Sequence, residues 1–177
     1  MAERAARRTP EFSSRPGLRV LAPLARFALR VDLAAAAGAG AHGVPIASTA
    51  CRATQLGDWH ALWLGPDEQL LLGPVEAGAA FVASVGHALG EVPHSLVDVG
   101  HRQGAFEVWG AAATSLLNVG CPLDLGLEAT PVGFCSRTVF GKSEIVLWRR
   151  GEHSFQLEVW RSFMPYVHGL LALAAAE

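Results

Sequence analysis

The sequence predicts one α+β domain built from antiparallel hairpins and packed helices. Two observations support this fold class: short apolar runs come in pairs around turn residues, and helical apolar periods separate these pairs. A third is that no glycine-rich G-x-G-x-x-G or P-loop motif joins a strand to a helix, as many nucleotide-binding folds require. The chain has 177 residues, of which 51% are hydrophobic and 17% charged. One domain of this size can bury roughly 70% of its unfolded surface.

The first residues differ from the rest of the chain. Residues 1–17 combine Arg, Ser, Thr and two prolines with almost no apolar period. We expect a flexible Arg-rich tail there, before a domain that spans residues 18–177. An anionic partner or a transit peptide is the alternative to a solvated tail, although Glu3 and Glu11 argue against transit.

The next two segments carry weak signals. Residues 18–33 mix short apolar clusters with charges, and their assignment stays open between helix and strand. Residues 34–43 are almost entirely Ala and Gly, which favours a flexible connection.

Regular elements follow from residue 59. Apolar runs at 59–64 and 69–72 flank a Gly-Pro-Asp-Glu turn, which predicts a hairpin. Apolar residues at intervals of three and four predict a helix over 75–89, between Pro74 and Gly90. The runs at 95–99 and 105–109 predict a second hairpin, with its turn at 100–104.

The C-terminal third repeats this pattern. A short Ala/Leu helix is expected over 111–119, ending at Gly120. Strands are expected at 137–140, 144–149 and 155–160, and a closing helix over 162–176. The two halves share a strand–strand–helix order, which is compatible with a split ferredoxin-like arrangement.

Charge and the length of the apolar runs argue against two classes of partner, nucleic acid and membrane. The formal net charge is −2 and the pI is about 6.4, so the whole-molecule field offers no attraction for nucleic acid. No apolar run reaches the ~20 residues that a bilayer requires, and no early run matches a secretory signal. We therefore expect a soluble cytoplasmic protein with neither nucleic-acid nor membrane partners.

No constellation of residues predicts chemistry. The three cysteines form no C-x-x-C motif and the seven histidines show no metal-ligand spacing, so buried free thiols and no metal site are expected. Asp98 and His101 lie close enough in sequence for acid–base work, but an Asp-capped turn accounts for them more simply. The sequence thus predicts no catalytic, cofactor-binding or metal-binding residue.

Paired tryptophan and arginine residues are the candidates for a partner interface. Trp148 precedes Arg149, and Trp160 precedes Arg161. Trp and Arg are enriched where protein interfaces concentrate their binding energy. Packing in the core is the alternative for each ring, since large aromatic side chains also dominate core energetics.

Four blocks together carry a family resemblance: residues 62–71, 97–102, 131–138 and 155–163. The chain resembles the gamma subunit of heterotetrameric sarcosine oxidase over residues 50–175. The blocks Gly133-x-Cys135-x-Arg137-Thr138 and 157–163 are the most specific. One departure is His101, which stands where the family pattern has a small polar residue.

This resemblance implies a fold, a reaction and partners. The fold would be similar to the folate-binding domain of the glycine-cleavage T protein, with a ferredoxin-like core. The complex of that family oxidatively demethylates sarcosine to glycine, with oxygen as acceptor, and yields peroxide and formaldehyde or methylenetetrahydrofolate. The implied role of this chain is a non-catalytic structural subunit that docks mainly on the alpha subunit, with beta and delta in the complex. FAD, FMN, NAD, zinc and tetrahydrofolate would belong to those other subunits.

Two alternatives remain at this point. A stand-alone folate-binding one-carbon carrier or aminomethyltransferase-like protein of the same fold would need a buried carboxylate, for which Asp98 and Glu158 are the candidates. Residues 131–137 lack the Gln-Glu of one folate-binding branch of that fold. An unrelated interaction module that uses the basic tail is the third hypothesis.

Overall fold

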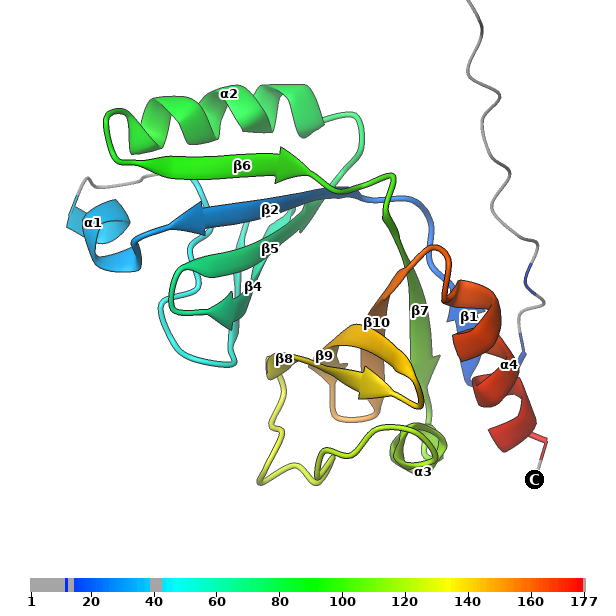
Figure 1. Cartoon of the computed structure of the whole chain (residues 1–177). Helices are drawn as coiled ribbons and strands as arrows, with labels where there is room; N and C mark the ends of the chain where they lie inside the picture. Colours follow the sequence, from blue (N-terminus) through cyan, green and yellow to red (C-terminus); the bar gives the residue numbers. More distant parts are fainter. Residues whose placement is uncertain (1–11, 13–14, 39–42, 177) are drawn as a thin grey trace, which may run out of the picture.

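The computed structural model describes residues 12, 15–38 and 43–176. They form two five-stranded antiparallel sheets and four helices (Figure 1). The elements are, in chain order, β1 Leu18–Val20, β2 Ala25–Val31, α1 Leu33–Gly38, β3 Ala53–Leu56, β4 Trp59–Gly65, β5 Glu68–Gly73, α2 Gly78–Leu89, β6 His94–Asp98, β7 Gln103–Trp109, α3 Ala113–Asn118, β8 Cys135–Phe140, β9 Ser143–Gly151, β10 Ser154–Trp160 and α4 Met164–Ala174. The expected α+β class is confirmed.

The first sheet is a ferredoxin-like unit made from one continuous stretch of chain. Its elements run β2-α1-β4-β5-α2-β6, and its strands lie in the order β6-β2-β5-β4, with β3 added beyond β4. This is the β-α-β-β-α-β arrangement with two crossover connections. Helix α2 covers one face of the sheet (Figure 1).

The second sheet repeats this order but takes one strand from elsewhere. Its elements run β7-α3-β9-β10-α4, with β8 added at the edge beyond β9. The place beside β7, which a strand following α4 would fill, is taken by β1. Figure 1 shows β1 beside α4. The two halves are therefore the related units that the repeated element order predicted, but the second is closed by β1, which precedes the first unit in the sequence.

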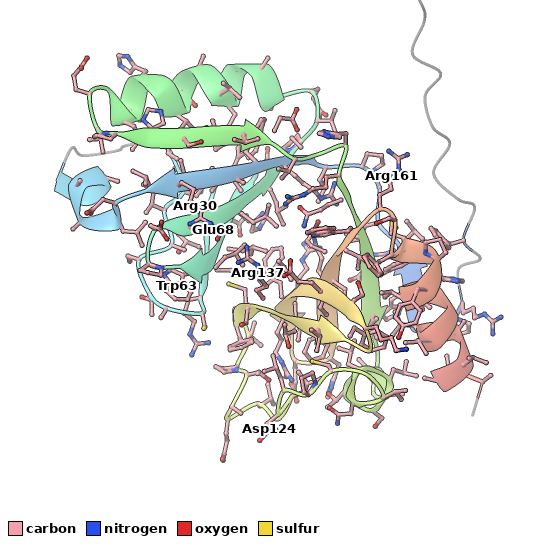
Figure 2. All side chains as sticks on the ribbon, in the orientation of Figure 1. Arg30, Trp63, Glu68, Asp124, Arg137 and Arg161 are labelled. Atoms are coloured by element: carbon pink, nitrogen blue, oxygen red, sulfur yellow. The ribbon has the colours of Figure 1, made fainter. Side chains whose placement is uncertain are left out.

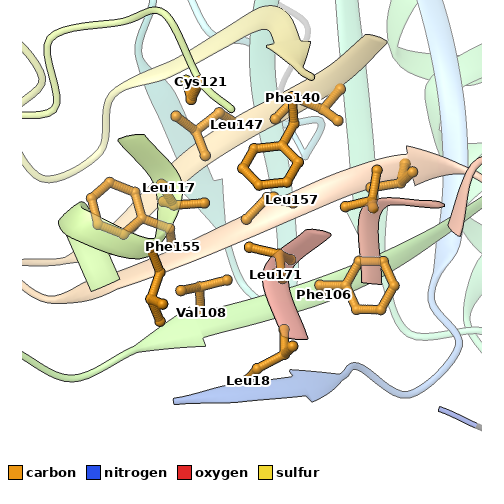
Figure 3. Packing of buried hydrophobic residues seen from close by; sticks show 14 of the residues in the cluster. Leu18, Phe106, Val108, Leu117, Cys121, Phe140, Leu147, Phe155, Leu157 and Leu171 are labelled. Atoms are coloured by element: carbon orange, nitrogen blue, oxygen red, sulfur yellow. The ribbon is translucent and has the colours of Figure 1, made fainter. Parts of the chain in front are cut away.

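Two helix-covered cores lie on the outer faces of the sheets. The core under α3 and α4 includes Phe106, Phe140, Phe155 and Leu171, all buried (Figure 3). The core under α2 joins Phe81 and its neighbours on that helix to the outward face of β2. Both arise from alternation in the strands and from three- and four-residue spacing in the helices.

The inner faces of the two sheets pack against each other and form a third core. Leu62, Leu70 and Leu72 of the first sheet meet Val146 and Trp148 of the second. Figure 2 shows Arg137 between the sheets, facing Arg30 and Glu68 on the first sheet. The molecule thus has four layers, with helices outside and sheets inside.

One glycine is required where the second sheet meets α4. Gly141 turns the chain between β8 and β9 with φ +59°, a value that L side chains rarely adopt. A Cβ there would also lie 2.5 Å from the Tyr166 hydroxyl oxygen. The turn therefore fixes α4 close against the β8–β9 hairpin.

Several sequence predictions are confirmed by the structure. The hairpin at 59–72 is β4 and β5, and the helices expected at 75–89, 111–119 and 162–176 are α2, α3 and α4. The three C-terminal strands are β8, β9 and β10, with β8 beginning at Cys135. Residues 18–33 supply β1 and β2, which belong to different sheets.

The second predicted hairpin is wrong. β6 pairs with β2 in the first sheet, and β7 pairs with β1 and β10 in the second. Residues 99–102 therefore carry the chain from one sheet to the other instead of turning it back. A local pattern of two strands around a short turn is the same in both cases, so only long-range pairing distinguishes them.

Two predicted segments lie partly outside the described residues. Of the predicted tail, residues 12 and 15–17 are described: the Phe12 ring centre lies 5.6 Å from that of Phe106, on the core under α4, and Arg15 forms an isolated bridge with Leu18. Residues 1–11 and 13–14 lie outside the description. In the expected Ala/Gly connection, Leu33–Gly38 is the helix α1, and residues 39–42 are not described. None of the helices in the described ranges is long and apolar enough to cross a membrane.

Candidate partner interface and the layer between the sheets

A buried ion pair joins the two sheets. Arg26 on β2 and Glu158 on β10 have side chains that are 2% and 0% exposed, and Arg26 Nε donates to Glu158 Oε2 at 2.6 Å. Gln156 Nε2 donates to the other carboxylate oxygen at 2.7 Å, and Arg26 Nη1 donates to the Leu24 carbonyl at 3.1 Å. Because removal of either charge would leave the other buried and unpaired, this pair constrains how the sheets meet.

A second set of charges bridges the sheets nearer to solvent. Glu68 on β5 accepts from Arg30 on β2 at 2.8 Å and from Arg137 on β8 at 2.6 Å (Figure 2). Glu68 raises the pKa of the Arg137 guanidinium by hydrogen bonding to it. The side chains of Arg30 and Arg137 are 55% and 39% exposed, so each pair contributes little to stability.

Two of the predicted interface residues are buried within this chain. Trp148 is 7% exposed and belongs to the core between the sheets. Arg149 is 1% exposed: its guanidinium lies 4.4 Å from the centre of the Phe155 ring and donates to the carbonyls of Glu152 and Leu125. The expected exposure of these two side chains is wrong, because β9 is paired on both sides and covered on both faces.

The other predicted pair lies at the end of β10 and faces solvent in part. Trp160 is 40% exposed, and the Arg102 guanidinium lies 5.4 Å from the centre of its ring. Arg161 is half-buried, and its backbone N–H donates to the Arg102 carbonyl. Trp160 and Arg161 are therefore placed where a partner could contact them.

The outer side of α4 is an apolar surface that the sequence prediction did not single out. Phe163, Tyr166 and Leu173 are 38%, 38% and 69% exposed, while Met164 and Leu171 between them are buried. Helix α4 has apolar residues on both sides and no Asp, Glu, Lys or Arg. We call Phe163, Tyr166 and Leu173 the α4 stripe. The signal that could have found it is the width of the apolar face, since a helix on a protein surface ordinarily has a polar side.

The residues considered for chemistry are held in structural roles. The Asp98 carboxylate accepts from the Gly100 backbone N–H at 2.8 Å, which is the expected Asp-capped turn. Cys135 is fully buried between the sheets, and burial raises the pKa of its thiol to about 12. No group of three or more potential metal ligands occurs among the residues that the structure describes.

Comparisons with known proteins agree with this architecture. The family model of the sarcosine oxidase gamma subunit family matches residues 28–177. Sarcosine oxidase subunit gamma of Corynebacterium sp. (strain P-1) is 36% identical over 111 residues, which are 62% of this chain and 54% of that protein. The gamma subunit of Arthrobacter sp. is 36% identical over 94 residues, covering 53% of this chain and 45% of that protein. The chain thus spans about half the length of the curated relatives that it matches.

Solved structures extend the similarity to nearly the whole chain. A chain of the heterotetrameric sarcosine oxidase from Corynebacterium sp. U-96, solved with pyrrole 2-carboxylate, is 28% identical with a TM-score of 0.79, and the match covers 90% of this chain and 83% of that one. The glycine cleavage system aminomethyltransferase T from Bartonella henselae has a TM-score of 0.67 at 13% identity, over 88% of this chain and 45% of that one, and it shares the fold. Sequence and structure together show that the chain belongs to the sarcosine oxidase gamma subunit family.

Proposed function

We propose that this chain is a non-catalytic structural subunit of a heterotetrameric sarcosine oxidase. The observation that carries the proposal is the match to a chain of such a heterotetramer over 90% of this chain. The assembled enzyme would demethylate sarcosine oxidatively to glycine and release peroxide and formaldehyde or methylenetetrahydrofolate. Its FAD, FMN, NAD, zinc and tetrahydrofolate would be bound by the other subunits, in the cytoplasm.

The charged side chains between the sheets are paired with one another, and this pairing supports a structural role. Arg26 and Glu158 neutralise each other in a buried pair, and Glu68 bridges Arg30 and Arg137. Groups with such partners hold elements together, whereas acid–base catalysis needs a group that is free to exchange a proton with a substrate. The inner layer therefore favours scaffolding over chemistry.

The stand-alone folate carrier is less well supported by the same contacts. Of the two carboxylates that it would require, Glu158 is fully buried against Arg26 and Gln156, and Asp98 caps a turn. Glu158 could bind a pterin ring only by breaking these contacts, and Asp98 is exposed, so neither is the buried and available carboxylate that the carrier requires. The similarity to the aminomethyltransferase is one of fold.

Docking on the alpha subunit would use exposed apolar and cationic side chains. Trp160 and Arg161 lie at the end of β10, and the α4 stripe follows directly in the chain. Aromatic and Arg side chains are enriched in the interfaces of protein complexes, and exposed apolar surface marks such interfaces. We propose that these residues contact the alpha subunit, with beta and delta completing the complex.

The test is co-expression of the tagged full chain with the proteins encoded beside it. We expect a stoichiometric flavin-containing complex that oxidises sarcosine, and a separated chain that is colourless and does not bind tetrahydrofolate in calorimetry. Trp160→Ala and Arg161→Ala should each lower the amount of alpha subunit recovered by roughly tenfold, the effect of an interface residue worth more than 1 kcal/mol. The turnover per flavin of the complex that still forms should be unchanged.

A matched control shows whether a lower recovery reflects loss of a docking residue or loss of any exposed apolar side chain. Val119 is 60% exposed and lies just after α3, and Val119→Ala should leave recovery of the alpha subunit unchanged. Full sarcosine oxidation by the other subunits without this chain would contradict the structural role. Saturable binding of tetrahydrofolate by the separated chain would favour the carrier instead.

A further inference from the structure

A cavity of about 370 Å³ lies beside the segment that connects β1 to β2, at one end of the layer between the sheets. Aliphatic side chains, among them Leu24, Leu72 and Val75, form one wall. Trp148 forms another, and His60, Arg150 and Gln156 supply polar groups. Cavities of this size with an apolar wall and a few polar groups are typical of small-molecule sites.

Gln156 presents a fixed hydrogen-bond acceptor to this cavity. Its side chain is 1% exposed and lines the cavity. Its Nε2 donates to Glu158 Oε1 at 2.7 Å, and since an ionised carboxylate only accepts, the amide cannot be turned the other way. In the described part of the chain no donor bonds Gln156 Oε1, and this oxygen is not one of the buried atoms that lack a partner, so it is accessible in the cavity and can accept a hydrogen bond from a ligand.

Arg150 supplies a cation that is positioned but not neutralised. Its guanidinium lies 5.0 Å from the centre of the Trp148 ring, a geometry that favours a cation over the ring face. Among the carboxylates of the described residues, including Asp58 and Glu76 that also line the cavity, none forms an ion pair with Arg150. A carboxylate from outside the chain could therefore pair with it.

The two polar groups lie close enough to act on one small molecule. Gln156 is paired with Trp148 across β10 and β9, the Arg150 guanidinium lies 5.0 Å from the centre of the Trp148 ring, and all three residues line the cavity. The His60 ring centre lies 4.9 Å from that of Trp148 and extends the aromatic wall. Burial, reinforced by the Arg150 charge, lowers the pKa of His60, so this imidazole is neutral near pH 7 and Arg150 is the cation of this wall.

We propose that this cavity binds a small, flat aromatic carboxylate that carries an N–H or O–H donor next to the acid group. The carboxylate pairs with Arg150, the donor bonds Gln156 Oε1, and the ring lies against the aliphatic wall beside Leu24 and Val75. The site is independent of the proposed subunit role, because none of its residues is assigned to the partner interface except the buried ring of Trp148.

The test uses 2-aminobenzoate, whose carboxylate, amine and ring match the three features, in calorimetric titration of the full chain. Two analogues isolate the contacts: 2-aminobenzamide lacks the charge and benzoate lacks the donor. We expect saturable binding of 2-aminobenzoate, with each analogue bound roughly tenfold more weakly, as loss of a hydrogen bond to a charged or buried partner predicts. Equal binding of all three compounds, or no saturable binding at 10 mM, about the limit of specific recognition, would overturn the proposal.

Arg150→Gln tests the assignment of the cation. It should weaken 2-aminobenzoate roughly tenfold and leave 2-aminobenzamide unchanged, because only the carboxylate needs the charge. Arg19→Gln is the matched control: Arg19 also lies over a tryptophan, 5.3 Å from the Trp109 ring centre, but it pairs with Glu107 and is outside the cavity. Arg150→Gln that folds, by circular dichroism, and binds 2-aminobenzoate as tightly as the unaltered chain would contradict the site.

Discussion

The outer faces of the two sheets and the layer between them are built from different side chains. The outer faces are filled by aliphatic and aromatic residues under α2, α3 and α4. The inner layer combines a smaller apolar core with a fully buried ion pair and a chain of exposed ones. Apolar packing has no preferred direction, whereas an ion pair has a required partner and geometry.

The difference separates two structural tasks. Each outer core joins helices to the sheet of its own half, and burial of apolar area stabilises that half. The inner layer determines which face of one half meets which face of the other. Our hypothesis is that Arg26 and Glu158 give this contact one register, because a wrong alignment would leave both charges buried without partners.

The largest effect should come from breaking the buried pair. Arg26→Met alone leaves Glu158 buried without its guanidinium, and we expect the free energy of unfolding in urea to fall by ~3–5 kcal/mol. Combining Arg26→Met with Glu158→Leu replaces both charges by apolar groups and should restore most of that loss. A double variant as unstable as the single one would show that the charges themselves stabilise the contact.

An exposed pair provides the control for this comparison. Arg19 on β1 and Glu107 on β7 form an ion pair in which the Arg19 side chain is 56% exposed. Arg19→Ala should therefore cost less than ~1 kcal/mol in the same measurement. A loss as large as that of Arg26→Met would mean that burial is not what distinguishes the two pairs.

The next effect tests whether β1 belongs to the outer core of the second half. Leu18 on β1 is 1% exposed and packs in the core under α3 and α4. Leu18→Ala should lower the free energy of unfolding by ~2–5 kcal/mol, as expected for a buried leucine. Leu173→Ala, at a side chain that is 69% exposed, should change it by less than ~0.5 kcal/mol. Similar losses in both variants would contradict a core role for β1.

The smallest expected effect is a difference in the alkylation rates of two buried thiols. It tests whether the inner layer opens before the outer core. Cys135 lies between the sheets and Cys121 under α3, and burial raises the pKa of both thiols. Since the thiolate is the reactive form, iodoacetamide at pH 8 should modify half-buried Cys51 and spare both others in the folded chain. In dilute urea, Cys135 and Cys121 should react at the same rate if the two regions open together. Faster reaction of Cys135 would show that the inner layer separates first.

The same thiol predicts a dependence of stability on alkaline pH. The pKa of Cys135 is raised from 9.0 to about 12 in the folded chain, so above pH 9 the unfolded chain loses a proton that the folded chain keeps. Unfolding is therefore favoured as pH rises between these values. The urea midpoint should fall from pH 8.5 to pH 10.5, about the range in which a free thiol ionises.

Local patterns predicted most of the elements, and long-range pairing explains what they missed. Alternation and turn residues located β4, β5 and the three C-terminal strands, since these are formed by neighbours in the chain. The residues at 100–104 have the composition of a hairpin turn, and they carry no information about the pairing of β6 with β2. The local sequence therefore predicted a hairpin that does not form. The two strands in residues 18–33 were likewise ambiguous, since each finds its partner in a different sheet.

Only some of the candidate interface residues are exposed, for a related reason. Trp148 and Trp160 each stand beside arginine, but Trp148 lies within the internal strand β9, whereas Trp160 is the last residue of β10. The two tryptophans are the same residue type but occupy different positions in the sheet. Their burial therefore depends on these positions, which the local sequence does not reveal. The apolar width of α4 was present in the sequence but could be assigned to the core until Phe163 and Leu173 were seen to face outward.

The placement of β1 has a consequence for how the chain folds as it is synthesised. Among the described strands β1 is synthesised before the others, yet β7, the described strand with which it pairs, begins at Gln103. The first half, from β2 to β6, can close on itself while β1 waits. The second half is completed only when α4 emerges, so the first strand and the last helix of the described residues finish the same unit. A circular permutant that begins at β2 and carries β1 after α4 would present both units to the ribosome in uninterrupted order.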